Sequence, residues 1–174
     1  MIRHRWSLVL VGAAGLWSLV ACSAPPPVPS PEPTTEPTID ERSYQLGVIG
    51  GFAEVVGVGV KRLALSSAMS PEAMDGLIEE AEKIIARNDA LAYLETDFLV
   101  TDLFPSEVTD GKHVILIYRE PGLLEEYQSL KSRKEELIDE GRYEGEARKD
   151  IARGMGRMLS YPEERIERML SESR

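Results

Sequence analysis

The chain of 174 residues contains few of the side chains on which several common kinds of site depend. It has one cysteine and two histidines, and its 20 Lys and Arg residues are outnumbered by 30 Asp and Glu residues, giving a formal net charge of −10. One cysteine excludes an intramolecular disulfide framework and a zinc site built from paired cysteines. The deficit of positive charge argues against a nucleic-acid partner, because phosphate backbones are bound by basic surfaces.

The first 22 residues differ in composition from everything that follows. Arg3 and Arg5 are present without any acidic residue, and they precede an uncharged stretch of 14 residues from Ser7 to Val20. A stable membrane span needs about 20 apolar residues, so this stretch is short for one. A basic start followed by a short apolar region predicts an export signal peptide over residues 1–21.

The end of this segment, Leu19-Val20-Ala21-Cys22, resembles the lipobox of bacterial lipoproteins. The resemblance implies that the leader is cleaved before Cys22 and that fatty acyl chains on the Cys22 sulfur hold the protein at the bacterial membrane. A plain secretory leader or an uncleaved anchor is the alternative. The lone cysteine favours the lipobox, because it lies where the acylation requires it. The resemblance covers residues 1–22 only and assigns the rest of the chain to no family.

The residue after the cysteine bears on location within the cell envelope. Ser23, rather than Asp, resembles the pattern that is sorted to the outer membrane in bacteria with two membranes; with one membrane, the same signal means its outer face. Loss of Arg3 and Arg5 with the leader would leave 18 basic and 30 acidic residues, a net charge of −12. Anionic lipids repel such a domain, so we expect the acyl chains alone to hold it at the membrane.

A proline-rich segment separates the cysteine from the remaining chain. Seven of the eleven prolines lie between Ser23 and Thr38. Such a segment cannot bury a core and favours polyproline II, so residues 22–38 are predicted to be the lipidated cysteine and a linker. Residues 39–174 are predicted to form a single globular domain, since their number suits one ordinary domain.

Hydrophobic periodicity predicts an α+β fold that is mainly helical, with about five helices and a small two-stranded sheet. The expected strands are Leu91–Leu94 and His113–Tyr118, the second buried on both faces. Helices are expected over 39–67, with a capping box formed by Thr38 and Glu41, and over 70–88 after a Ser70 cap. The remaining helices are expected at 121–140, 144–159 and from 160 onward.

Five glycines, at positions 47, 50, 51, 57 and 59, lie in the first expected helix. They do not form a dinucleotide-binding loop, because no strand precedes them and position 62 is Arg rather than a third glycine. Each glycine lowers helix stability by about 1 kcal/mol, so compensation by close packing or by ligand contact is expected. The first interpretation is that another element of the fold approaches this helix closely.

The stretch from Tyr93 to Pro105 is the main candidate for a functional site. Thr-Asp followed by two apolar residues occurs there twice, between the two expected strands, and loops between strands often carry function. The interpretations are structural capping with apolar residues that plug the core, a site for a small ligand or a partner, and catalysis. The candidate ligand or partner residues are Tyr93, Asp97, Thr101, Asp102 and His113.

No complete catalytic or metal-binding motif accompanies these residues. The spacing of the acidic residues matches no calcium loop, and no G-x-S-x-G motif presents a serine to His113. We therefore expect neither a metal nor another cofactor. The sequence predicts a non-catalytic envelope lipoprotein whose acidic helical domain binds a small ligand or an envelope partner. The alternatives are a lipid-tethered hydrolase or metal-dependent enzyme using Asp97, Asp102 and His113, and a structural or assembly lipoprotein.

Overall fold

Five consecutive buried residues, Val114–Tyr118, form the central strand β3 of the sheet. The computed structural model describes residues 38–104 and 106–172. Strands β1 (Leu63–Leu65) and β2 (Leu91–Glu95) flank β3 in the order β1-β3-β2, and both pair with it antiparallel. Strand β3 lies between two other strands, and helices cover both of its faces. Its sequence is therefore continuously apolar instead of alternating between apolar and polar residues.

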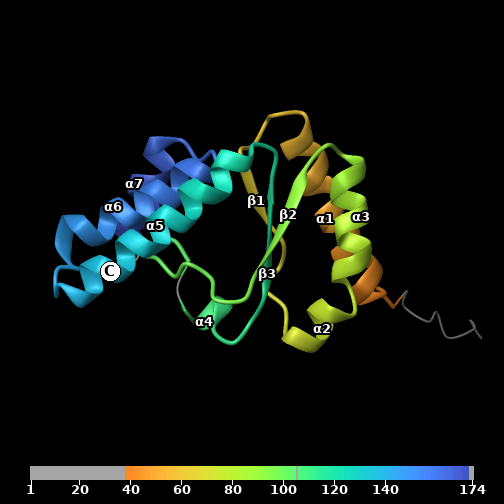
Figure 1. Cartoon of the computed structure of the whole chain (residues 1–174), viewed down its shortest axis with the longest axis horizontal. Coiled ribbons are helices and arrows are strands. Elements are labelled where there is room, and N and C mark those ends of the chain that lie inside the picture. The colour runs from red at the N-terminus through yellow and green to blue at the C-terminus, as the bar shows by residue number, and fades with distance from the viewer. Residues whose placement is uncertain (1–37, 105, 173–174) are drawn as a thin grey trace, which may run out of the picture. The chain divides into compact units, whose positions relative to one another are not determined.

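Helices cover both faces of this sheet (Figure 1). On one side lie α1 (Glu41–Gly57), α2 (Pro71–Asp75) and α3 (Ile78–Arg87); on the other lie α5 (Pro121–Asp139), α6 (Gly145–Met158) and α7 (Glu163–Glu172). The short α4 (Ser106–Thr109) precedes β3. Ile115 and Ile117 pack against α1 and α3, whereas Leu116 packs against α5 and α6. The period of two along β3 thus builds two separate cores.

The coarse prediction of a mainly helical α+β domain with a small sheet is confirmed, and its finer counts are wrong. The described residues contain three strands and seven helices, not two strands and about five helices. The additional strand is β1, and its pairing with β3 places Leu63 opposite Tyr118. All core clusters come from residues after Thr38, so this part of the chain has a core of its own.

The helix expected over 39–67 is wrong at both ends. It begins after Asp40, whose carboxylate accepts the backbone N–H of Ser43 at 3.1 Å, so Asp40 rather than Thr38 is the cap. It ends at Gly57, and the chain turns through Gly59, whose φ of +79° suits glycine. Leu63 continues the helical spacing of apolar residues although it belongs to a strand, which is why periodicity alone extended the helix.

The helix expected over 70–88 is two helices. Ser70 caps α2 as expected, since its hydroxyl oxygen accepts the N–H of Ala73. The chain then breaks at Gly76 and resumes as α3. Met74, Ala81 and Ile85 are all buried in the same core, so the apolar face stays continuous across the break. Periodicity therefore does not reveal this interruption.

The predicted signal peptide, Cys22 and the linker up to Pro37 lie outside the described residues. Within the described residues, no helix combines the length and the apolar character needed to cross a membrane.

Candidate functional site

The segment between β2 and α4 contributes apolar side chains to the core. Phe98, Leu99 and Leu103 are buried, and the rings of Phe98 and Phe104 meet edge to face with centroids 5.9 Å apart. Phe98 and Leu99 pack between the sheet and the helices α5 and α6, and Leu103 packs against α6 and α7. The segment therefore acts as a plug for the core, which is one of the interpretations given to it from the sequence.

Helix α5 holds the backbone of this segment in place. Inside the core, the N–H of Leu99 donates to the hydroxyl oxygen of Tyr127 at 3.0 Å, and burial raises the pKa of Tyr127. Two turns further along α5, the ammonium of Lys134 donates to the carbonyl oxygen of Val100 at 2.8 Å. A backbone fixed at successive residues gives the adjoining side chains defined positions.

Thr101 closes a tight turn rather than capping a helix. Its backbone exchanges two hydrogen bonds of 3.1 Å with Phe104, and its hydroxyl oxygen accepts the N–H of Leu103 at 3.2 Å. The next residue, Asp102, accepts hydrogen bonds from Arg148 of α6, with the Arg148 Nε at 2.7 Å. The Asp102 side chain is 14% exposed and that of Arg148 53% exposed, so this ion pair fixes the turn from the solvent side.

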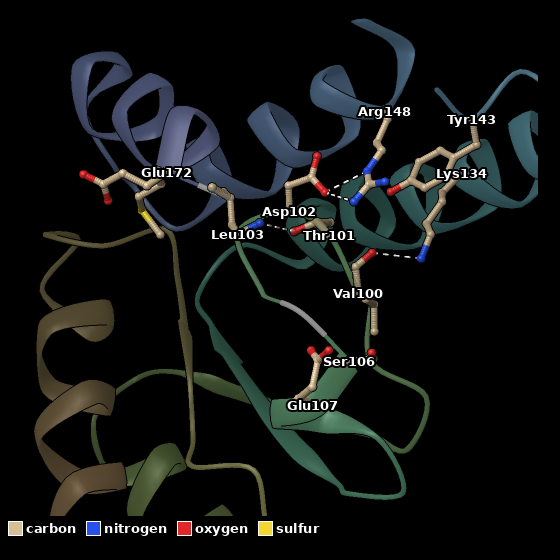
Figure 2. A pocket seen from close by; sticks show the side chains of 11 residues that line it. Val100, Thr101, Asp102, Leu103, Ser106, Glu107, Lys134, Tyr143, Arg148 and Glu172 are labelled. Carbon is tan, nitrogen blue, oxygen red and sulfur yellow. Dashed lines mark hydrogen bonds and ion pairs between the residues drawn. The ribbon is translucent and has the colours of Figure 1, made fainter. Parts of the chain in front are cut away.

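A cavity of about 630 Å³ opens beside this turn (Figure 2). Its volume lies within the range of small-molecule sites. Side chains from the turn, from α4 and from α5 to α7 line it: Val100, Thr101, Asp102, Leu103, Ser106, Glu107, Lys134, Tyr143, Arg148, Met169 and Glu172. The sequence motif therefore serves two purposes, since its apolar residues fill the core while Thr101 and Asp102 face an open space.

Positive groups gather on one wall of the cavity. Figure 2 shows Arg148, Tyr143 and Lys134 on the same side, with Arg148 directed at Asp102. The Lys134 ammonium lies 5.5 Å from the centre of the Tyr143 ring. Desolvation has the largest influence on the pKa of Lys134 and lowers it; the negative charge of Asp97 opposes this effect, and the neighbouring Lys131 and Arg148 lower the pKa further. Desolvation and the charge of Asp102 raise the pKa of Tyr143, so its hydroxyl stays protonated.

The other three candidate residues do not line this cavity. Tyr93 lies in β2 opposite Leu116 and packs against the core. Asp97 is exposed and forms an ion pair of 2.9 Å with Lys131, which also contacts the buried Glu95. His113 pairs through its backbone with Met69, and its Nδ1 atom is buried with no hydrogen-bond partner among the described residues. The structure thus brings together Thr101 and Asp102 only.

Of the eleven lining residues, Thr101 and Asp102 were predicted as site residues and the other nine were not, among them Lys134, Tyr143 and Arg148. A signal for Lys134 exists in the sequence, because Leu123, Tyr127, Lys134 and Leu137 share one face of α5 at helical spacing. Leu123, Tyr127 and Leu137 are buried in the core, so a lysine in that series occupies an apolar position. Tyr143 and Arg148 follow no comparable pattern, since their places depend on how α5 and α6 pack.

Only part of the glycine-rich segment is explained by close packing. A Cβ atom on Gly57 would lie 1.8 Å from the carbonyl oxygen of Asn88, and one on Gly50 would lie 3.5 Å from Ile84. A Cβ atom on Gly47 or Gly51 would have no neighbour within 4 Å. Close approach of another element therefore accounts for Gly57, whereas Gly47 and Gly51 face outward.

Comparison with known proteins assigns no family to the chain. No family model, no curated protein and no solved structure matches it. Within residues 38–104 and 106–172, no three His, Cys, Asp or Glu side chains are grouped so as to hold a metal ion. The features of the chain that bear on its function are therefore the cavity and the sequence of the first 22 residues.

Proposed function

We propose that the chain is a lipid-anchored protein of the bacterial cell envelope whose domain binds a small polar molecule without transforming it. The cavity beside Thr101 and Asp102 is the observation that carries the binding role. It combines apolar and charged lining residues, and tethers from α5 and α6 fix its wall. Concave sites with a few fixed polar groups are the usual setting for small-molecule binding.

The state of the polar groups favours binding over catalysis. General acid–base chemistry needs a titratable group that faces the substrate with its proton free to transfer. Asp102 is engaged by the guanidinium of Arg148, and the Thr101 hydroxyl accepts a backbone N–H. Asp97 and His113, which the enzyme alternative also requires, contact Lys131 and Met69 instead of the cavity. No contact in the described residues favours that alternative.

The anchor is supported by the resemblance of Leu19-Val20-Ala21-Cys22 to a lipobox, and it is tested by substitution of the cysteine. Cells fed an alkyne-bearing palmitate should label the wild-type protein, which should fractionate with membranes. Cys22→Ser should lose both the label and the membrane association. Ser23→Ala is the matched control and should keep both. Membrane association of the Cys22→Ser protein would contradict the anchor.

A structural or assembly role is the second candidate, and one observation favours it. Gly47 and Gly51 lie one helical turn apart on α1 and have no close neighbours among the described residues. Glycine lowers helix stability by about 1 kcal/mol per residue, and packing within the domain does not offset this at these positions. An unchanged set of envelope complexes on native gels after Gly47→Leu and Gly51→Leu substitution would contradict this role.

A further inference from the structure

Of the two described cations that line the cavity, Arg148 forms an ion pair and Lys134 does not. Lys134 occupies a core-facing position on α5, and none of the ion pairs formed by the described residues includes it. Its ammonium donates one hydrogen bond, to the Val100 carbonyl oxygen, and an ammonium has three N–H donors. A half-buried cation whose partner is a neutral carbonyl gains strongly from an added anion.

The neighbours of Lys134 add further donors to the same wall. Arg148 binds Asp102 through Nε and one terminal amino group, both directed at the same carboxylate oxygen. The other amino group of its guanidinium makes no hydrogen bond within the described part of the chain. The hydroxyl of Tyr143 also lines the cavity and remains a donor because its pKa is raised. An ammonium, a guanidinium edge and a phenol thus border one space (Figure 2).

Two of the three carboxylates that line the cavity lie apart from its cations, and the third, Asp102, forms an ion pair with Arg148. Glu107 of α4 and Glu172 of α7 line it away from Lys134 and Arg148, and neither carboxylate forms an ion pair with another described residue. The negative charge of each disfavours an anion beside it and favours hydrogen-bond donors there. A ligand that suits the cavity carries its negative charge beside Lys134 and Arg148 and its donor groups beside Glu107 or Glu172.

We infer that the cavity binds the anionic oxygen group of a small polar molecule, through Lys134, Arg148 and Tyr143, with donor groups of that molecule facing Glu107 or Glu172. The inference rests on the proposed binding function and specifies the chemistry of its ligand. Carboxylate and phosphate groups both supply the required oxygen acceptors, and each matches an ammonium beside a guanidinium.

The test is a titration of the chain from Ser23 onward, which retains the whole described core, with acetate and with inorganic phosphate in separate NMR experiments. At least one anion should shift the backbone resonances of the turn from Val100 to Leu103 in a saturable way and should raise the pKa of Lys134. Saturation by one anion alone identifies that chemistry. Saturation by neither, or shifts confined to other surfaces, would overturn the inference.

Substitutions separate this site from nonspecific attraction. Lys134→Met should weaken binding of the effective anion by about tenfold or more, as expected for loss of a charged hydrogen bond. Lys134→Arg keeps the charge and should retain most of the affinity. Lys83→Met is the matched control, because Lys83 lies on α3 and pairs with Glu79 outside the cavity. Equal affinity in Lys134→Met and wild type, with both proteins folded by NMR, would overturn the inference.

The two proposals fail differently. An envelope molecule that occupies the cavity in wild type and in Lys134→Met with equal affinity would leave the binding function in place and contradict the anionic chemistry. If protein extracted from bacterial membranes carries no molecule in the cavity, while added phosphate or acetate binds at Lys134, the binding function is contradicted and the anion site remains.

Discussion

The hydroxyl oxygen of Tyr127 accepts the backbone N–H of Leu99 at 3.0 Å, between two side chains that are each 1% exposed. Tyr127 belongs to α5, and Leu99 belongs to the segment that leads to the cavity wall. This bond therefore links the packing of α5 to the position of Thr101 and Asp102, two and three residues further on.

Tyr127→Phe is expected to destabilise the domain by about 1–3 kcal/mol, because it leaves the Leu99 N–H buried without an acceptor. Equilibrium denaturant unfolding of both proteins measures the change. Tyr44→Phe is the control and should change stability little, since Tyr44 is 53% exposed on α1. Equal effects of the two substitutions would show that the bond does not hold the segment.

The Asp102–Arg148 ion pair should show a coupling energy of about 1 kcal/mol in a double-mutant cycle of Asp102→Asn and Arg148→Met, since Asp102 is largely buried. The control cycle uses Arg42 and Glu80, whose side chains are 53% and 49% exposed at an N–O distance of 2.6 Å. Solvent screens that pair, so we expect a smaller coupling there. A larger coupling energy for Arg42 and Glu80 than for Asp102 and Arg148 would contradict the role of the Asp102–Arg148 ion pair in holding the turn.

Two glycines of α1 should respond in opposite ways to alanine. Gly57→Ala places a methyl group against the Asn88 carbonyl and should destabilise the domain by about 3 kcal/mol. Gly51→Ala meets no atom within 4 Å and should stabilise it by about 0.5–1 kcal/mol through helix propensity. Thermal and denaturant unfolding distinguish these outcomes. Destabilisation by Gly51→Ala would mean that its outward face is occupied in the folded protein.

The lowered pKa of Lys134 predicts a pH dependence of stability. Folding disfavours the charged form of Lys134, so its pKa is lower in the folded chain than in the unfolded chain. Between neutral pH and the ordinary lysine pKa of about 10.4, the unfolded chain therefore binds more protons than the folded chain. The free energy of unfolding should increase with pH across this range. The difference in unfolding free energy between wild type and Lys134→Met isolates this contribution. We expect that difference to move in favour of wild type across this range; a constant difference would contradict the desolvation of Lys134.

Short sequence patterns predicted those parts of the fold that depend on residues close together in the sequence. The Ser70 cap, the apolar run of β3 and the end of α5 before Gly141, whose φ is +66°, all follow from short patterns. Strand β1 was missed because it has three residues and because Leu63 fits the helical spacing before it. Its pairing with β3 is a long-range contact that no local pattern records.

The residues of the cavity likewise fall into those that a local sequence pattern predicts and those that it does not. Thr101 and Asp102 were expected at a site because the Thr-Asp repeat lies in a loop between strands, and they line the cavity. Asp97 and His113 were grouped with them by sequence proximity, yet the turn at Thr101 separates their contacts. Lys134 and Arg148 reach the cavity from α5 and α6, and their contacts with the turn join residues far apart in the sequence, which no local pattern records.

Native mass spectrometry of the protein extracted from bacterial membranes tests the central claim, ligand binding in the cavity, most directly. Wild type should carry a bound small molecule in addition to its lipid. Ser106→Trp, which fills the cavity, should lose that molecule, and Ser132→Trp, at an exposed position of α5 outside the cavity, should keep it. Wild-type protein without a bound molecule, or equal occupancy in all three proteins, would contradict the account.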